Sequence, residues 1–341
     1  MDELEQIQAY LQNNAKLLET LCTDSLIVEP LGKGEHNKNY TLTDAATNKR
    51  YVLRINVLPQ PFHTNQVAYE FAALKALEPS GRAPVALYLD DTSQALGKGL
   101  LVESFCNGSE LNFDDLKADD LGCVAHIMAD VHATPVEVDS PLFKPADPLR
   151  ALFKECVERF DVYRGTTFEE ARYSNWIRRY LKGTQDAIDA SWGVKDGNHI
   201  INTETLPSHF LLAHGAGGMT GSFVDWERPV IGEVAQDLAF FVAPTTTFWD
   251  SGYLFPKDDI ASFIQTYWNA VEGRFDSKGF TQRFNAYLRV SILRSQTWFC
   301  KNAARYAQGS SAHTLQRTFD KWGTYVSDEF NAALFEDYFI D

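Results

Sequence analysis

The chain has 341 residues, a length that suits one large domain or two smaller ones. Hydrophobic residues make up 45% and aromatic residues 13% of the sequence, which predicts a packed core and excludes a disordered chain. The formal net charge of -15 disfavours nucleic acid and anionic membrane surfaces as partners, because an acidic surface repels phosphate groups.

The cysteines and the first residues indicate the compartment. The five cysteines are scattered and form no Cys-x-x-Cys pair, which favours reduced thiols over a disulfide framework or a zinc site. The first ten residues are acidic and lack the apolar core of a signal peptide. No run approaches the roughly 18 apolar residues that span a bilayer. We therefore expect a cytoplasmic protein without a membrane segment.

The first part of the chain predicts a small β-rich lobe. Leucine and isoleucine at near-helical spacing predict one amphipathic helix over 3–22. A second helix is expected over 65–81, where a Pro-Ser-Gly sequence ends it. Strand-like runs with turn-forming linkers occupy 25–31, 39–45, 50–57, 85–91 and 99–105. The order β-β-β-α-β-β predicts a mostly antiparallel sheet with one helix.

The rest of the chain is mainly helical. Helical periodicity extends over 114–192 and 233–337, and the segment 199–227 between them is strand-like. The sequence therefore predicts an α+β protein with a small antiparallel lobe at 1–105. A larger helical lobe at 106–341 would hold an embedded hairpin.

Several residues of the small lobe could bind a nucleotide. The turn "LGKGEHNK" holds Gly32, Gly34 and Asn37 between two strands, and such a turn can bring backbone N–H groups close to phosphates. An ordinary polar hairpin explains this turn equally well. Arg54 in a strand and Glu70 in the next helix could pair and hold the α- and β-phosphates, or could be surface residues that never meet.

The strand "LLVESFCNG" leads into the link between the lobes. Such a strand can offer backbone groups to an adenine edge near Glu103 and Phe105. A buried strand without any ligand is an equally good interpretation.

The Gly-rich segment "HGAGGM" after His214 raises the question of a catalytic turn. It joins the strand-like runs "HFLLA" and "TGSFVDW", which is the pattern of a hairpin turn. A hydrolase oxyanion hole is the other interpretation, but the chain has no Gly-x-Ser-x-Gly nucleophile elbow. We therefore expect a hairpin.

The loop before this hairpin offers better chemistry. The sequence "NTETLPSH" (202–209) contains a carboxylate, Glu204, and a possible metal ligand, His209, and Asp225 follows the hairpin. A carboxylate that orients or deprotonates a hydroxyl, together with ligands for a hard cation, is what phosphoryl transfer requires.

These residues resemble the aminoglycoside phosphotransferase and choline kinase family, which has a protein-kinase-like two-lobe fold. In that family a loop His-Gly-Asp-x-x-Pro-x-Asn precedes a short hairpin, which ends in Ile-Asp-Trp-Glu and is followed by Asp-Leu-Ala. "NTETLPSH" stands in place of the loop, and "FVDWERPVIGEVAQDLAFF" (223–241) matches the second part closely. "VLRIN", "YEFAAL", "LVESFCNG" and "MADVHATP" also fall in the family's order, so the resemblance covers nearly the whole chain.

The resemblance implies an ATP- and Mg²⁺-dependent phosphotransferase that acts on an alcohol group. Glu204 takes the place of the catalytic aspartate, and Asp225 would chelate Mg²⁺. His209 stands at the second metal ligand, which is usually asparagine. Asn202 replaces the histidine that supports the loop, and Asp237 would hold the loop backbone from the next helix.

Departures from the family loop leave an alternative open. Glutamate at 204 is one methylene longer than aspartate, which moves the base by about an ångström, and misplacement of that size is costly. Imidazole at 209 is a poor ligand for Mg²⁺, which prefers oxygen. The alternative is a catalytically impaired relative that binds nucleotide or a partner protein. The retained carboxylates at 204 and 225 favour an active kinase.

The resemblance places the acceptor site in the helical lobe. The expected substrate is a small molecule with a hydroxyl group, such as an amino alcohol, a sugar or an aminoglycoside-like compound. Tryptophan could bind a quaternary ammonium group, although aromatic residues at helical spacing are more often core residues. The candidate residues are Thr245, Thr246, Trp249, Asp250, Arg294 and Trp298. The oligomeric state and the choice between ATP and GTP stay open.

Overall fold

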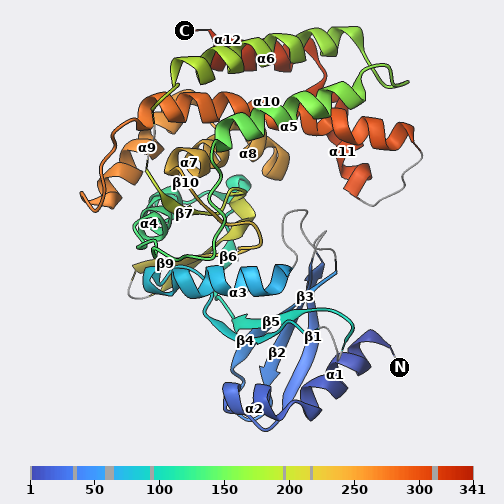
Figure 1. Ribbon diagram of the computed structural model, residues 1–341, viewed down its shortest axis with the longest axis vertical. Helices are drawn as coiled ribbons and strands as arrows, with labels where there is room; N and C mark the ends of the chain where they lie inside the picture. Colours follow the sequence, from blue (N-terminus) through green and yellow to red (C-terminus); the bar gives the residue numbers. More distant parts are fainter. Residues whose placement is uncertain are drawn as a thin grey trace.

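The computed structural model describes residues 2–33, 37–57, 65–92, 96–194, 197–215, 218–308 and 314–340. A sheet with its short helices lies at one end of the molecule, and a larger helical part lies at the other (Figure 1). Within these residues no helix is long and apolar enough to cross a membrane. The arrangement confirms the α+β class and the small antiparallel sheet beside a larger helical part.

The N-terminal sheet has five strands, and every neighbouring pair is antiparallel. The strand order is β1-β2-β3-β5-β4. The central strand β3 is buried at five consecutive positions, which fits its apolar residues, and one of the five is the charged Arg54. The strands are β1 (Leu26–Lys33), β2 (Asn37–Asp44), β3 (Arg50–Asn56), β4 (Ala86–Asp90) and β5 (Leu100–Ser104).

Helix α3 (Gln66–Leu77) lies between this sheet and the helical part (Figure 1). The 3₁₀ turn η1 (Glu78–Ser80) extends it, so the expected helix over 65–81 is confirmed. Its buried Ala73, Leu74 and Leu77 belong to the larger core of the molecule. The division of the chain at residue 105 stays a prediction.

The prediction of a single helix over 3–22 is wrong, because the helix is broken at Asn14. The structure has two helices, α1 (Glu3–Asn13) and α2 (Ala15–Leu21). Asn14 separates them with φ -99° and ψ 82°, and its side chain accepts the N–H of Leu17. An asparagine side chain that caps the second helix competes with helix continuation, and leucine spacing does not reveal this.

The helical part is built around the long helix α10 (Phe280–Ala307), which packs against α5, α6 and α7. The core of this helical part contains many large aromatic side chains. The other helices are α4 (Asp120–His132), α5 (Pro148–Tyr163), α6 (Ala171–Ala190), α7 (Val234–Val242), α8 (Pro244–Ser251), α9 (Lys257–Val271), α11 (Thr314–Tyr325) and α12 (Asp328–Phe339).

Short strands within the helical part position the candidate loop. β8 (Phe210–Gly215) and β9 (Gly218–Phe223) form the expected hairpin, in register from Phe210↔Phe223 to Gly215↔Gly218. β7 (His199–Ile201) pairs with β10 (Val230–Gly232), a strand that sequence patterning missed. This pairing brings the loop after Ile201 beside the segment 225–229. The remaining short elements are β6 (Ser109–Glu110), η2 (Phe113–Asp115) and η3 (Pro207–His209).

Candidate active site

The loop after β7 is fixed by Asp237 of α7. The Asp237 carboxylate accepts the backbone N–H of Asn202 at 2.7 Å and that of Thr203 at 2.8 Å. The Thr205 hydroxyl donates to the Asp237 carbonyl at 2.8 Å. Asp237 is fully buried, and charge-assisted bonds of this kind compensate a buried carboxylate for lost hydration. Asp237 therefore sets the conformation of the loop from a rigid helix.

Asn202 connects this loop to Asp225. The Asn202 side-chain amide donates to the Asp225 carbonyl at 2.9 Å, and its oxygen accepts the N–H of Glu204 at 3.1 Å. Thr203 and Asp225 have φ of 75° and 65°, a region that costs side-chain-bearing residues free energy. Backbone strain held in place by a hydrogen-bond network is a common feature of functional sites.

Glu204 lies between two arginines. Its Oε1 atom accepts from Nη2 of Arg294 at 2.9 Å and from Nη1 of Arg228 at 3.2 Å. The side chain is 35% exposed, so a small molecule can reach it. Burial acts to raise the pKa of Glu204, but Arg294 and Arg228 outweigh it and lower the pKa below its ordinary value. The carboxylate is therefore ionised at neutral pH and can accept a hydrogen bond from a hydroxyl group.

Asp225 lies between Arg54 and His209. Its Oδ1 atom accepts from Nη2 of Arg54 at 2.9 Å, and its Oδ2 atom is 3.4 Å from Nε2 of His209. The Asp225 side chain is 34% exposed. Within the described residues no three His, Cys, Asp or Glu side chains form a ready-made metal site. One accessible carboxylate nevertheless fits Mg²⁺, which in kinases is held by one or two carboxylates together with phosphates and water.

His209 fits a different role from the expected metal ligand. Its Nε2 atom faces the Asp225 carboxylate, and its Nδ1 atom is buried without a hydrogen-bond partner. Mg²⁺ prefers oxygen ligands, so the imidazole suits a partner of Asp225 better than a ligand.

Arg54 is the centre of a buried charge cluster. Its Nε atom is 2.7 Å from Oε1 of Glu70, so the structure brings together the pair that the sequence left open. Burial raises the pKa of Glu70 to about 8 and that of Glu103 to about 7. Burial acts to lower the pKa of Arg54, but Glu70, Asp225 and Glu103 outweigh it and raise the pKa. One guanidinium thus lies among three carboxyl groups, and burial keeps Glu70 and Glu103 partly protonated near neutral pH.

Asn37 and Gln66 hold the segment that follows Asp225. The Asn37 amide donates to Oε2 of Glu227 at 2.8 Å, and the Gln66 amide donates to the Glu227 carbonyl at 2.6 Å. The Tyr69 hydroxyl donates to the Pro229 carbonyl at 2.5 Å. The sheet end of the molecule therefore contacts segment 225–229 at several points. Asn37, a nucleotide candidate in the sequence, thus contacts Glu227 in the structure.

Three nucleotide candidates remain. Gly32 is exposed in β1, Phe105 directly follows β5, and Gly34 lies outside the described residues. The Phe105 ring is covered by the Arg50 guanidinium, 3.8 Å from the ring centroid.

The substrate candidates are on α8 and α10. The Trp249 and Trp298 rings meet edge to face with centroids 4.9 Å apart, and Asp250 follows on α8. The Lys321 amine lies 5.5 Å from the Trp249 ring centroid and donates to the Trp249 carbonyl at 2.5 Å. Thr245 and Thr246 are almost fully buried, and neither hydroxyl has a hydrogen-bond partner.

His214 takes no part in this site. It lies in β8 opposite Met219 and its Nε2 atom is 3.5 Å from Oδ1 of Asp120. The residues between Gly215 and Gly218 lie outside the described residues.

Sequence reasoning missed several site residues. Arg228 directly follows Asp-Trp-Glu in the sequence, and a charged residue at this position was a signal that could have been used. Glu155 and Arg159 are four residues apart on α5 and form an ion pair beside Arg294. Their contact with Arg294, the partner of Glu204, depends on the packing of α10 against α5, which no local pattern predicts.

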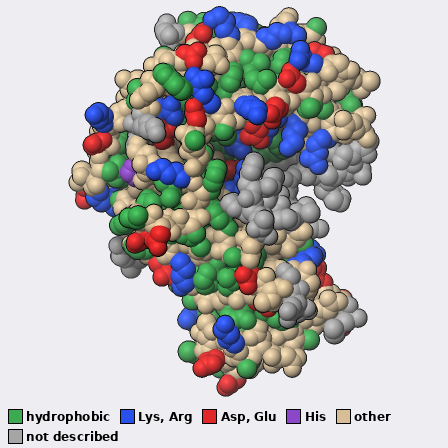
Figure 2. Space-filling view, in the orientation of Figure 1, with side chains coloured by type: hydrophobic (Ala, Val, Ile, Leu, Met, Phe, Trp, Pro, Cys, Tyr) green, Lys and Arg blue, Asp and Glu red, His purple; other side chains and the backbone are tan. Residues whose placement is uncertain are grey.

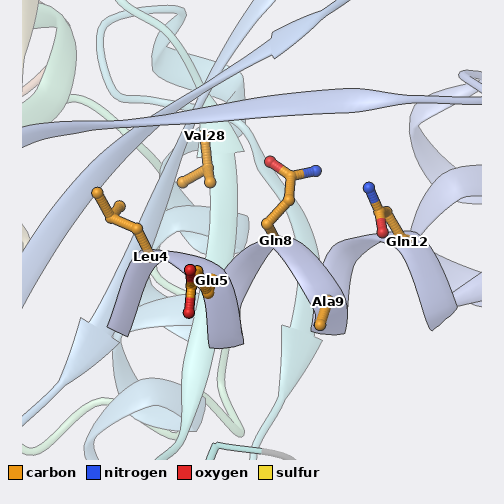
Figure 3. Close-up of a pocket in the computed structure, with 6 residues that line it drawn as sticks. All are labelled: Leu4, Glu5, Gln8, Ala9, Gln12 and Val28. Carbon is orange, nitrogen blue, oxygen red and sulfur yellow. The ribbon is translucent and has the colours of Figure 1, made fainter. Parts of the chain in front are cut away.

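Two surface pockets of the described residues lie elsewhere. One, of ≈ 390 Å³, lies between α1 and β1 and is lined by Leu4, Glu5, Gln8, Ala9, Gln12 and Val28 (Figure 3). The other, of ≈ 290 Å³, is lined by residues near Pro79, Asp130 and Arg274. Neither is lined by a residue of the candidate site.

The fold is similar to those of several solved structures. The structure is similar to a Ralstonia eutropha protein assigned as an aminoglycoside phosphotransferase, with a TM-score of 0.67, 13% identity and coverage of 98% of each chain. It is similar to a choline kinase from Cryptosporidium parvum, with a TM-score of 0.62, 15% identity and coverage of 98% of this chain and 100% of that one. A spectinomycin phosphotransferase in complex with ADP and spectinomycin gives a TM-score of 0.61 and 12% identity, covering 94% and 98% of the chains.

At these identities the likeness shows the fold, which is the expected one. No curated protein matches the sequence at a significant level. The sequence itself matches the phosphotransferase enzyme family over residues 27–279, which is well over half of the chain. The protein therefore belongs to the phosphotransferase enzyme family, as the resemblance of its motifs implied.

Proposed function

We propose that this phosphotransferase is a small-molecule kinase that transfers the γ-phosphoryl group of ATP to a hydroxyl group. One observation carries the proposal. The side chain of Asn202 bonds both to the Glu204 N–H and to the Asp225 carbonyl, so one residue fixes the candidate base relative to the candidate metal ligand. Preorganised placement of this kind is the main requirement of phosphoryl transfer.

In the proposed reaction the acceptor hydroxyl oxygen forms a bond to the γ-phosphorus, and the bond from that phosphorus to the ADP oxygen breaks. The hydroxyl proton passes to the Glu204 carboxylate, and the electron pair of the broken bond stays on ADP. Glu204 has a lowered pKa and is a weak base, so its main contribution is to orient the hydroxyl. Such a role suits a loose transition state in which the proton moves late.

The nucleotide would lie between the sheet and the loop. Arg54 would contact its phosphates, held in place by Glu70 at 2.7 Å, and Glu103 and Phe105 would lie near its base. Asp225 would hold Mg²⁺, which when bound neutralises charge on the phosphates. The spectinomycin phosphotransferase with the same fold binds ADP, which supports this placement.

The acceptor would be a small molecule such as an amino alcohol, a sugar or an aminoglycoside-like compound. The named neighbours in the comparison act on choline and spectinomycin, which supports a small hydroxyl compound. Trp249, Asp250 and Trp298 are proposed to line the acceptor side.

A second candidate is a relative that binds nucleotide without transferring phosphate. The observation that favours it is the occupation of Glu204 Oε1 by two arginines. Release of ADP from ATP in the presence of a panel of hydroxyl compounds separates the two. The kinase predicts acceptor-dependent ADP release that Glu204→Gln lowers about 100-fold or more, with nucleotide binding kept.

The exposed Glu158→Gln on α5 is a matched control and should leave turnover unchanged. Nucleotide binding without ADP release for any acceptor would instead favour the second candidate.

A further inference from the structure

Arginines gather around Glu204 and its partner Arg294. Arg294 of α10 and Arg228 both donate to Glu204 Oε1, and Arg159 of α5 donates to the Arg294 carbonyl at 3.3 Å. Glu155 forms an ion pair with Arg159, and its Oε2 atom is 3.9 Å from Nε of Arg294. Lys and Arg side chains alternate with Asp and Glu side chains over α5 on the face in Figure 2.

This cluster has more positive than negative groups. Three guanidinium groups face two carboxylates, those of Glu155 and Glu204, although the whole chain carries a net charge of -15. The Nε atoms of Arg159 and Arg294 are buried without a hydrogen-bond partner. The cluster thus keeps unused donors and a surplus of positive charge near the candidate base.

Glu204 can bind an acceptor hydroxyl without releasing the arginines. Both arginines donate to Oε1, so Oε2 can accept the hydroxyl. The Arg294 side chain is only 13% exposed, so water hydrates its remaining donors poorly. An anionic group on the ligand would satisfy both arginines, because guanidinium groups bind carboxylate and phosphate in fork geometry.

We propose that the acceptor carries an acidic group, a carboxylate or a phosphate, which binds Arg294 and Arg228 beside Glu204 and places the acceptor hydroxyl at Oε2 of Glu204. This inference rests on the proposed kinase function and narrows its substrate class to acidic hydroxyl compounds. It disfavours amino alcohols and aminoglycosides, whose ammonium groups the arginines repel.

The aromatic residues that were expected to bind an ammonium group also favour an acidic acceptor. The Trp249 ring already has the Lys321 amine 5.5 Å from its centroid, and the Phe248 ring has the same amine at 5.4 Å. The same amine donates to the Phe248 carbonyl at 2.7 Å. A cation of the chain itself therefore already lies beside the ring that was expected to bind a cationic substrate.

The test is thermal unfolding of the full chain with Mg²⁺ and a saturating non-hydrolysable ATP analogue, AMP-PNP. Four compounds of similar size are titrated: glycerate, glycerol 3-phosphate, glycerol and 3-amino-1,2-propanediol. The variants are Arg294→Gln and, as a matched control on the same helix, the exposed Arg305→Gln. Arg228→Gln, at a position 33% exposed, repeats the measurement if Arg294→Gln does not fold.

We expect glycerate or glycerol 3-phosphate to raise the melting temperature in a saturable way, and glycerol and the amine to have no effect. Arg294→Gln should require at least about tenfold more anion, whereas Arg305→Gln should behave as the parent protein. An equal shift with the amine, an equal anion response in Arg294→Gln, or no response to either anion well into the millimolar range would overturn the inference.

Two further outcomes separate the possible failures. If Arg294→Gln weakens AMP-PNP binding but leaves ADP binding intact, the arginines hold the γ-phosphate of the nucleotide, and the acceptor inference is wrong. If AMP-PNP fails to stabilise the parent protein at all, the proposed kinase function fails first. Anion binding measured without nucleotide then decides the role of the arginines separately.

Discussion

Glu204 is the residue on which the chemistry depends. Its carboxylate accepts hydrogen bonds from a loop arginine, Arg228, and a helix arginine, Arg294. Burial acts to raise the pKa of Glu204, but the two arginines outweigh burial and lower it. A folded-state pKa below the ordinary value of 4.5 means that this ion pair stabilises the fold above that pH. The contribution is lost as the pH falls through the lowered pKa, so neutral pH keeps Glu204 in its reactive ionised form.

Replacing Glu204 by aspartate tests whether the loop is built for the longer side chain. Glu204→Asp should lower kcat at least about tenfold, because a displacement of about an ångström misplaces the carboxylate. The KM for ATP should change little. Steady-state kinetics measure both parameters, and an undiminished kcat would show that the reach of the carboxylate is unimportant.

Glu103 predicts a distinct pH dependence of stability. Burial raises its pKa from 4.5 to about 7, so the folded protein binds more protons than the unfolded chain between these values. The free energy of unfolding should therefore fall as the pH rises through this window, by up to about 1.4 kcal/mol per pH unit. Glu103→Gln should remove its share of the fall and leave the share of Glu70, whose pKa burial raises to about 8, and the exposed Glu110→Gln should change neither. Urea unfolding from pH 5 to 8 measures the slopes, and parallel slopes in all proteins would refute the assignment.

At the scale of elements, the loop 202–205 depends on helix α7. Asp237 accepts the N–H groups of Asn202 and Thr203 with one carboxylate, and the Asp237 carbonyl accepts from Thr205. The loop thus gains its shape from an element 32 to 35 residues further along the chain.

Asp237→Asn should therefore damage both stability and activity. The amide keeps one acceptor but turns an N–H group towards a backbone N–H, which should cost about 2 kcal/mol. Urea unfolding gives the stability, and ADP release gives the turnover, which we expect to fall more than nucleotide affinity. Unchanged stability would show that the loop is held by other contacts.

Replacing His214 in the β8–β9 hairpin should, unlike Asp237→Asn, leave activity intact. His214 is 46% exposed, and its partner is Asp120 rather than a residue of the candidate site. His214→Ala should leave kcat/KM within about twofold, because surface substitutions rarely exceed about 0.5 kcal/mol. A large loss of turnover would return the Gly-rich segment to consideration.

Much of the fold was predictable from the sequence, because strand alternation and helix periodicity are local signals. The exceptions have physical reasons. The break at Asn14 comes from a side-chain cap, and β10 is too short to show a period. The contacts that define the site join residues far apart in the sequence, so local patterns do not predict them. Arg294 meets Glu204 across 90 residues, and only packing of α10 places it there. The sequence identified Glu204, Asp225 and Asp237 as candidates, but not Arg228 beside Glu204 or Arg159 beside Arg294.

At the scale of the whole molecule, segment 225–229 links the sheet to the loop. Arg54 of β3, Asn37 of β2, and Gln66 and Tyr69 of α3 all donate to it. Asp225 contacts both Arg54 of the sheet and Asn202 of the loop, so a shift of the sheet would move the loop that holds Glu204. Nucleotide binding on the sheet side and chemistry at Glu204 should be coupled through this segment.

Tyr69→Phe tests the coupling without touching a charged group. The variant removes the bond to the Pro229 carbonyl and leaves the N–H of Phe143 without the Tyr69 oxygen. We expect a loss of about 1–2 kcal/mol in the free energy of unfolding, with weaker binding of ATP. Urea unfolding and nucleotide titration measure the two effects. Weaker stability with unchanged ATP affinity would limit the segment to a structural role.

The most direct test of the central claim is thermal unfolding with ATP in the presence and absence of Mg²⁺. At 100 times its Kd a ligand stabilises the native state by about 2.7 kcal/mol, which gives a clear shift. A kinase that uses Asp225 predicts strong stabilisation by ATP only with Mg²⁺, and loss of this Mg²⁺ dependence in Asp225→Asn. Equal stabilisation with and without Mg²⁺, or no stabilisation by ATP in the millimolar range, would contradict the proposed site.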